Sequence, residues 1–371
     1  MRDFEIFAVI LAGGSGTRFW PVSRTLRPKQ LCKLGKSDKT MIELTLDRLD
    51  GFIPPENRII VTHCDQADST KKIITNKASL ILAEPLAQNT ANALALAAYE
   101  IKNRQKLSDS KKEAIMISLH ADHLIDNIEN FYASLNDGIL AAKSGYLTLI
   151  GIIPNKPETG YGYIEIGKSL AELTTFPQDK AFEVRNFKEK PDFVTASKYI
   201  DSKNFLWNSG LFIWSVDTFL EQLNMYLPKT ATNFAQTFSK NSSWQDLSKS
   251  EAIKFYENLE NISVDHAILE KSKKIAVIKG DFSWQDIGSW DALSQAFGAD
   301  QYGNYTVGDV VSIDSRNCTI VSDGCFIGAL GIENLVVVQS NNAILVCPKD
   351  RAQDVKNIVA YLKSIHRTEL T

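Results

Sequence analysis

The chain has 371 residues, of which 44% are hydrophobic and 23% are charged, and its formal net charge at pH 7 is −3. This length allows one large domain or two ordinary ones, and the composition is that of a globular protein rather than a disordered one. The slightly acidic charge gives no indication of a nucleic-acid or anionic-membrane partner, so any site for a polyanion must be a local basic patch.

The amino-terminal segment and the cysteines indicate a cytoplasmic protein. The apolar run in MRDFEIFAVILAGG is too short for a secretory signal peptide, and no apolar segment approaches the roughly 20 residues that a membrane span needs. The five cysteines are scattered without a C-x-x-C pair, which is typical of reduced thiols. We therefore expect a cytoplasmic location, with no membrane partner and no nucleic-acid partner.

Short apolar runs alternate with helical patterns in the first half of the chain. A helix is predicted over Asn89–Asn103, with Asn89 as its N-cap, because apolar residues recur there at three- and four-residue steps. Strands that are apolar throughout are buried on both faces, which predicts a Rossmann-like, mostly parallel α/β sheet with ligands at the carboxyl ends of its strands. The predicted strands are Ile6–Leu11, Arg58–Thr62, Ser79–Ala83, Ala114–Leu119 and Tyr146–Ile152.

The sequence changes character after Phe297. Short β-branched runs separated by Gly, Asn and Asp turns are followed by a helical pattern over 350–364, which predicts a small β-rich domain with a terminal helix. We therefore expect a catalytic domain over 1–297 and a C-terminal domain over 298–371. The apolar runs NLVVVQ and AILVCP in the second domain either cover the first domain or form a homodimer contact, and the sequence leaves both alternatives open.

A glycine-rich loop follows the first predicted strand. It lacks the third glycine of the dinucleotide fingerprint, where Phe19 stands, and it lacks the lysine of the Walker motif. Glycines let a backbone approach phosphate oxygens and point its N–H groups at them. We expect a triphosphate to meet both amides and cations here; the alternative is a turn with solvated basic residues. Three glycines and four basic residues lie in this segment: Gly13, Gly14, Gly16, Arg18, Arg24, Arg27 and Lys29.

Seven short motifs follow one another along nearly the whole chain. They are LAGGSGTRFWPVSRTLRPKQ (11–30), EPLAQNTANA (84–93), HADHLI (120–125), PETGYGYI (157–164), FKEKPD (187–192), WNSGLF (207–212) and WQDIGSWDAL (284–293). Together they resemble the sugar-nucleotide pyrophosphorylases, in particular the bacterial mannose-1-phosphate guanylyltransferases. The resemblance implies a nucleotidyltransferase fold with a β-helix-like tail. It also implies transfer of GMP from GTP to mannose 1-phosphate, which gives GDP-mannose and pyrophosphate.

The resemblance also implies roles for individual charged residues. Nucleotidyl transfer needs aligned oxygens and neutralised charge more than covalent help from the protein. By resemblance, Arg18 and Lys29 hold the triphosphate, with Arg18 on the leaving pyrophosphate, and Lys190 contacts the sugar phosphate. Asp122 and Asp286 are the implied ligands of one Mg²⁺ ion, which takes one or two carboxylates besides phosphates and water.

The other implied site residues form a nucleotide set and a sugar set. Glu84 is an apt acceptor for the N1–H and N2–H₂ donors of guanine, and Glu189 for sugar hydroxyls. Glu189 and Lys190 alternate along a predicted strand, so we expect their side chains to point in opposite directions unless a bulge intervenes. The nucleotide set is Leu11, Ala12, Gly13, Gly14, Ser15, Gly16, Thr17, Glu84, Asn89 and Thr90. The sugar set is Gly162, Glu189, Lys190 and Asn208.

The chain departs from the family pattern at a few positions, which leaves its specificity open. Gln88 stands where Arg is usual, and His120 and His266 replace Pro and an aromatic residue. The alternatives are another sugar 1-phosphate or base, such as a manno-heptose phosphate or a dTDP- or ADP-sugar product, and a catalytically silent nucleotide-sensing subunit. For His120 and His123 we expect packing or hydrogen-bonding roles rather than zinc, because no cysteine or third histidine is near in sequence. Longer relatives append an isomerase domain, and we expect a single activity here.

Overall fold

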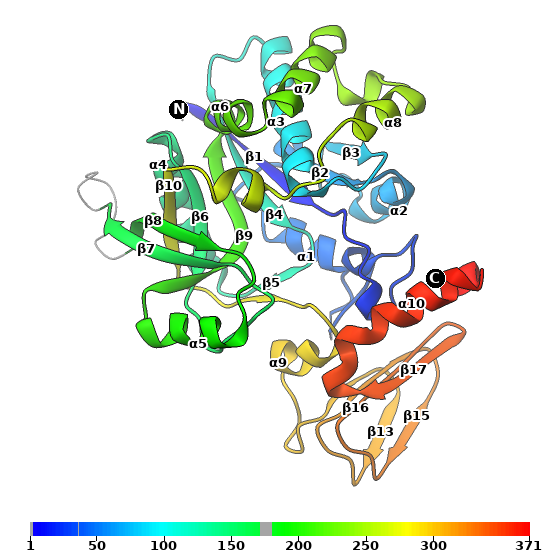
Figure 1. The fold of residues 1–371 in the computed structure, drawn as a ribbon. Coiled ribbons are helices and arrows are strands. Elements are labelled where there is room, and N and C mark those ends of the chain that lie inside the picture. Colours follow the sequence, from blue (N-terminus) through cyan, green and yellow to red (C-terminus); the bar gives the residue numbers. More distant parts are fainter. Residues whose placement is uncertain (1–2, 36, 171–179) are drawn as a thin grey trace.

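The computed structural model describes residues 3–35, 37–170 and 180–371, and nine strands in this part of the chain form the main sheet (Figure 1). They are β1 (Phe4–Leu11), β2 (Arg58–His63), β3 (Leu80–Glu84), β4 (Glu113–His120), β6 (Leu147–Ile152), β7 (Tyr163–Ser169), β8 (Ala181–Lys188), β9 (Phe205–Ser215) and β10 (Ile275–Gly280). Their order across the sheet is β3-β2-β1-β4-β9-β6-β10-β8-β7.

The five strands predicted in the first half of the chain are present as β1, β2, β3, β4 and β6, and all five run in one direction. β1 pairs in parallel with β2 and β4, and β2 pairs in parallel with β3. β9 lies antiparallel between β4 and β6, so those two strands also share a direction. The prediction of a mostly parallel sheet therefore holds for these strands. The sheet as a whole is mixed, because β8 and β9 run the opposite way.

Helices cover both faces of the sheet, as strands that are apolar on both sides require. In β1, Phe7 and Val9 point into a core shared with α3, α6, α7 and α8. Ile6 and Ala8, on the opposite face, point into a core shared with α1, α2, α4 and α5. These helices are α1 (Met41–Asp47), α2 (Cys64–Ile74), α3 (Asn89–Leu107), α4 (Ile128–Lys143), α5 (Phe193–Ser202), α6 (Val216–Tyr226), α7 (Pro228–Lys240) and α8 (Lys249–Glu257).

The start of α3 differs from its prediction. The N-cap is Gln88 rather than Asn89, and no side chain caps the helix. Asn89 has a φ of 69°, and its Oδ1 accepts a hydrogen bond from the adjacent Thr90 N–H at 2.9 Å. Asparagine tolerates this left-handed conformation better than most residues, and there its side chain serves the next amide instead of the end of the helix.

Residues after α9 (Leu293–Phe297) form a β-rich C-terminal part built of parallel rungs. β12, β14 and β16 pair in parallel, β17 closes this sheet in antiparallel, and β13 pairs with β15. The predicted terminal helix over 350–364 is a 3₁₀ turn over Lys349–Asp354 followed by α10 (Val355–Ser364). The strands are β12 (Tyr305–Val307), β13 (Val310–Ile313), β14 (Thr319–Asp323), β15 (Ile327–Leu330), β16 (Leu335–Ser340) and β17 (Ala343–Pro348).

The two apolar runs of this C-terminal part cover the catalytic part with one face. Val336 and Val338 of β16 share a core with Phe19, Trp20 and Trp290. On β17, Leu345 is buried in the same core, whereas Ile344 and Val346 are exposed. The buried residues of these runs therefore cover the catalytic part, which is the first of the two alternatives. A homodimer contact stays a prediction, as does the domain boundary at 297/298.

In the part of the chain that the structure describes, no helix combines the length and apolar character needed to cross a membrane. The cytoplasmic location stays a prediction.

Candidate active site

A short pair of antiparallel strands brings the two predicted metal ligands together. β5 (His123–Ile125) pairs with β11 (Trp284–Asp286), so that Asp286 lies opposite His123, next to Asp122. The buried Lys29 ammonium sits between the two carboxylates, with Nζ at 2.9 Å from Asp122 Oδ2 and 3.6 Å from Asp286 Oδ1. Three residues that are distant in sequence thus meet in one cluster of charges.

The environment of this cluster fixes its charges. Burial alone raises the pKa of the Asp122 carboxyl, but the Lys29 ammonium and two neighbouring histidines outweigh it and hold that pKa well below its usual range. Burial lowers the pKa of His123 to about 4, so its imidazole is neutral at pH 7. Its Nδ1 accepts a hydrogen bond from Trp284 Nε1 at 3.2 Å, and its ring stacks on His120 with centroids 4.7 Å apart. His123 thus has the packing and hydrogen-bonding role expected from the sequence.

Helix α1 holds the backbone on both sides of Asp122. Thr45 Oγ1 donates to the carbonyl of Ala121 at 3.3 Å, and Arg48 Nη2 donates to the carbonyl of His123 at 2.9 Å. Both donors come from one helical turn, so the position of Asp122 depends on the position of α1.

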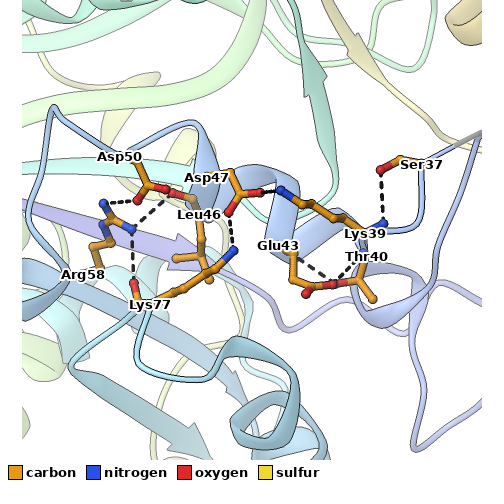
Figure 2. Close-up of polar contacts among 9 residues, drawn as sticks. All are labelled: Ser37, Lys39, Thr40, Glu43, Leu46, Asp47, Asp50, Arg58 and Lys77. Atoms are coloured by element: carbon orange, nitrogen blue, oxygen red, sulfur yellow. Dashed lines mark hydrogen bonds and ion pairs between the residues drawn. The ribbon is translucent and has the colours of Figure 1, made fainter.

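The helix itself is anchored at both ends (Figure 2). At its start, Thr40 and Glu43 form a capping box, in which the Thr40 N–H donates to Glu43 Oε2 at 2.8 Å. At its end, Asp47 accepts from Lys39 and Lys77. Just beyond it, the buried Arg58 guanidinium donates to the Leu46 carbonyl and to Asp50 Oδ1, at 3.2 and 2.8 Å. These contacts tie α1 to β2 and to the turn before β3.

One glycine of the amino-terminal loop is required by close packing. Gly16 has a φ of 60°, and a Cβ at this position would lie 2.4 Å from Lys29 Cβ and 2.6 Å from the Lys29 amide nitrogen. A side chain at residue 16 would therefore displace Lys29 from the two aspartates. Gly13 and Gly14 are exposed, and a Cβ on Gly14 would meet nothing within 4 Å, which leaves space for a ligand beside the backbone.

The basic run after this loop divides between two destinations, which corrects the expectation that all four cations face a triphosphate. Arg18 lines a large cleft of about 1260 Å³, named here the Arg18 cleft, and Lys29 reaches the aspartates. Arg24 instead donates to the carbonyl of Leu370, and Arg27 lies 3.9 Å from Asp323 Oδ2. Arg24 and Arg27 face the C-terminal part because the chain reverses between them, with reciprocal backbone hydrogen bonds.

A cavity of about 280 Å³, named here the Glu84 cavity, contains much of the predicted nucleotide set. Burial raises the pKa of Glu84 to about 8, although a hydrogen bond from the Tyr256 hydroxyl at 3.2 Å partly lowers it. The predicted residues that line this cavity are Leu11, Ala12, Gly13, Gly14, Glu84, Asn89, Thr90 and Asp122. Ser15 and Thr17 line a different, smaller cavity beside α10.

A second cavity, of about 390 Å³ and named here the Asp265 cavity, contains the whole predicted sugar set. The prediction that Glu189 and Lys190 point apart is wrong. β8 ends at Lys188, Lys190 has a φ of 46°, and its Nζ lies 2.9 Å from Glu189 Oε1. The alternation of a strand does not apply, because the backbone leaves the strand there. Gly162 makes room for Glu189, since a Cβ at residue 162 would lie 2.5 Å from Glu189 Oε2.

Asp265 lies outside all seven of the sequence motifs. This residue opens a short π-helical turn and lines the Asp265 cavity, where it accepts a hydrogen bond from Asn208 Nδ2 at 3.0 Å. Burial, together with the nearby Glu189 carboxylate, raises the pKa of Asp265 to about 6. The only signal in the sequence was an acidic residue next to the noted His266, in a segment without a strand pattern.

The two cavities meet at Asp122. Asn89, Thr90, His120 and Asp122 line both of them, and Lys190 and Asp286 line both the Asp265 cavity and the Arg18 cleft. A molecule in the Glu84 cavity and one in the Asp265 cavity would therefore approach each other beside the paired carboxylates. This arrangement suits the joining of two substrates, with cations available for phosphate oxygens.

The comparisons with known proteins agree with this geometry. The profile of the Nucleotidyl transferase family matches residues 7–302, and that of the MannoseP isomerase/GMP-like beta-helix domain matches residues 308–362. The chain belongs to the nucleotidyl transferase family. It is an enzyme of nucleotidyl transfer with a β-helix-like C-terminal domain, as the sequence predicted, and enzymes of this family generally use a divalent metal ion.

Individual relatives are more specific. A mannose-1-phosphate guanylyltransferase of Escherichia coli K12 is 34% identical over 377 residues, which cover 100% of this chain and 76% of that protein. The alginate biosynthesis protein AlgA of Pseudomonas syringae pv. tomato is 35% identical, over 97% of this chain and 72% of its own length. A crystal structure described as a mannose-1-phosphate geranyltransferase from Thermus thermophilus is 31% identical, with a TM-score of 0.84 over 97% of this chain and 100% of that one.

Proposed function

We propose that this chain transfers GMP from GTP to mannose 1-phosphate and releases pyrophosphate. The observation that carries this proposal is the meeting of the Glu84 and Asp265 cavities at Asp122. Guanine presents N–H donors, for which Glu84 is an acceptor, and a hexose presents hydroxyls, for which Glu189 and Asp265 are acceptors. The names of the relatives that align with the whole chain support this choice of substrates.

In this proposal the side chains of the chain bind and align the phosphates. Lys190 lines both the Asp265 cavity and the Arg18 cleft, where it is placed to hold the phosphate of the sugar. Arg18 lines the same cleft and is suited by its guanidinium fork to bind the departing pyrophosphate. Lys29 is fixed by packing against Gly16 and supplies a buried positive charge beside the reacting phosphorus.

The residues at the junction fit a divalent cation. Asp122 and Asp286 place carboxylate oxygens within 3.6 Å of the single Lys29 ammonium, so both carboxylates reach one cationic position. Hard carboxylate oxygens are the ligands that Mg²⁺ prefers, and we propose these two residues as its protein ligands. A bound Mg²⁺ supplies positive charge to the phosphate oxygens.

The decisive experiment combines the purified chain with mannose 1-phosphate, Mg²⁺ and each of GTP, ATP, CTP, UTP and dTTP in turn, and follows pyrophosphate release. We expect release with GTP. Release with another nucleotide alone would replace the proposed base, and no release with any of them, together with binding of GTP, would favour a nucleotide-sensing subunit. Replacing mannose 1-phosphate with glucose 1-phosphate or a manno-heptose phosphate tests the sugar, and replacing Mg²⁺ with Zn²⁺ tests the metal.

A further inference from the structure

One residue of α8 holds two side chains that offer hydrogen-bond acceptors to a base in the Glu84 cavity. The Tyr256 hydroxyl donates to Glu84 Oε1 at 3.2 Å, and the Tyr256 backbone carbonyl accepts from Gln88 Nε2 at 3.4 Å. Tyr256 itself is completely buried, and its ring packs edge-on against Trp244, so its position is set by the core.

These two contacts determine which acceptor atoms of Glu84 and Gln88 remain available to a ligand. A carbonyl only accepts hydrogen bonds, so the Gln88 amide must turn its nitrogen toward Tyr256 and keep its oxygen for another donor. Gln88 Oε1 is buried and has no partner among the described residues. Glu84 keeps Oε2, which would lie 3.8 Å from a Cβ on Gly13. Glu84, Gln88 and Gly13 all line the Glu84 cavity.

Two acceptors match the Watson–Crick edge of guanine, which presents the donors N1–H and N2–H₂ there. Adenine presents an acceptor at N1, and cytosine one at N3, so either base would set an acceptor against the ionised form of Glu84. We propose that Tyr256 is a positioning residue for guanine selectivity, acting through Glu84 and Gln88; this inference rests on the proposed function. The sequence around Gln88 gives no sign of it, because Tyr256 lies 168 residues further along the chain.

The ionisation of Glu84 gives this role a measurable signature. Tyr256 of α8, His63 of the neighbouring strand β2, and His120 and Asp122 across the shared cavity are the titratable groups around Glu84. Its pKa of about 8 means that the free carboxyl is largely protonated at pH 7, whereas guanine donors need the ionised form. GTP binding should therefore strengthen as the pH rises from 6 to 8 and level off above. The Tyr256 hydroxyl lowers that pKa. Its loss should therefore raise the pKa of Glu84 and move the increase in GTP binding to higher pH.

The test compares Tyr256→Phe with the full-length wild-type enzyme, using GTP and mannose 1-phosphate across pH 6–9. We expect KM for GTP to rise about 2- to 12-fold, the effect of one hydrogen bond, with kcat unchanged and the midpoint of the pH dependence displaced to higher pH. Tyr305→Phe is the matched control, because Tyr305 is also buried but its hydroxyl has no partner among the described residues and lies in the C-terminal domain. A purely structural role for Tyr256 would leave the pH midpoint in place.

Two further variants test the same inference, so that the outcome does not depend on whether Tyr256→Phe alone folds. In Glu84→Gln, adding Tyr256→Phe should produce little extra loss, because the hydroxyl acts through the carboxyl; additive losses would overturn the inference. In Gln88→Met, the preference for GTP over ITP, which lacks the 2-amino group, should fall, and an unchanged preference would also overturn it. A wild-type enzyme that does not prefer GTP refutes the proposed function. A GTP-selective wild type with an unaffected Tyr256→Phe refutes only the role of Tyr256.

Discussion

The Glu84 cavity and the Asp265 cavity meet at Asp122, but the chain builds them in different ways. The Glu84 cavity is made by segments that directly follow β1, β3 and β4, three parallel strands whose carboxyl ends lie at one edge of the sheet. The Asp265 cavity is made largely by the segment before β7, the residues that follow β8, part of β9 and a π-helical turn, beside strands whose directions alternate. Ligand sites generally lie at the carboxyl ends of parallel strands, and the Glu84 cavity follows this rule. The Asp265 cavity instead depends on particular irregularities of the backbone.

The two cavities also differ in the groups that surround a carboxyl with a raised pKa. Glu84 accepts a hydrogen bond from a neutral donor, the Tyr256 hydroxyl. Asp265 faces an amide donor from Asn208 and, near it, the like charge of Glu189. In the proposed function, the Glu84 cavity takes the base and the more polar Asp265 cavity takes the sugar hydroxyls.

The largest effect is expected at the junction that both cavities share. Asp286→Asn removes one of the two charges around Lys29 and one proposed metal ligand, so kcat should fall on the order of 10²- to 10³-fold. Steady-state kinetics with both substrates measures it, and Asp201→Asn, an exposed carboxylate on α5 outside the cavities, is the control. Wild-type turnover in Asp286→Asn would remove this residue from the reaction.

A change confined to the Asp265 cavity should affect one substrate alone. Gly162→Ala forces Glu189 to move, because the new methyl group would lie 2.5 Å from its Oε2. Overpacking of this kind costs about 1–3 kcal/mol; if all of it falls on sugar binding, KM for mannose 1-phosphate should rise about 5- to 150-fold with little change in GTP affinity. Gly328→Ala on β15, which lies outside the cavity and whose nearest neighbour would lie at 3.5 Å, should change neither value. An equal rise in both KM values would contradict the separation of the two cavities.

Asp265→Asn should make the protein more stable while it weakens sugar binding. The pKa of Asp265 in the folded chain is about 6, above its usual 3.8, so ionisation destabilises the fold progressively between pH 4 and 6 and fully above that range. The variant should therefore gain about 1–3 kcal/mol at pH 8 and almost nothing at pH 4. Thermal unfolding at both pH values gives the result, and an equal gain at both would show that desolvation of the charge is not the cause.

The smallest effect is expected from the outward-facing half of the basic run. The side chains of Arg27 and Asp323 are each nearly half exposed and lie 3.9 Å apart, so Arg27→Gln should cost less than about 1 kcal/mol and leave kcat within about twofold. The same substitution at Arg18, which lines the Arg18 cleft, should lower kcat/KM far more. Similar losses of kcat/KM in Arg27→Gln and Arg18→Gln would show that Arg18 is no more important for activity than Arg27.

The comparison of the two cavities also explains what could be predicted from the sequence. Apolar runs such as Ile6–Leu11 indicate buried parallel strands, and their ends locate the loop at Gly13 and Gly14 without knowledge of the fold. The convergence of Asp122 with Asp286, however, depends on the pairing of β5 with β11, which no local pattern encodes. The same applies to Asp265, Tyr256 and the turn at Lys190, because each depends on a contact or a backbone angle that long-range packing imposes.

The division of the basic run has a consequence for the C-terminal domain. Trp20 and Arg24 hold the carbonyl of Leu370, and the indole of Trp290, a residue that closely follows Asp286, donates to the Trp20 carbonyl. The C-terminal domain thus holds the segment at Trp20 and packs on Trp290, and these two segments, 270 residues apart in sequence, are also joined to each other directly. Mild heating that loosens these contacts should abolish the activity while the main sheet is still folded.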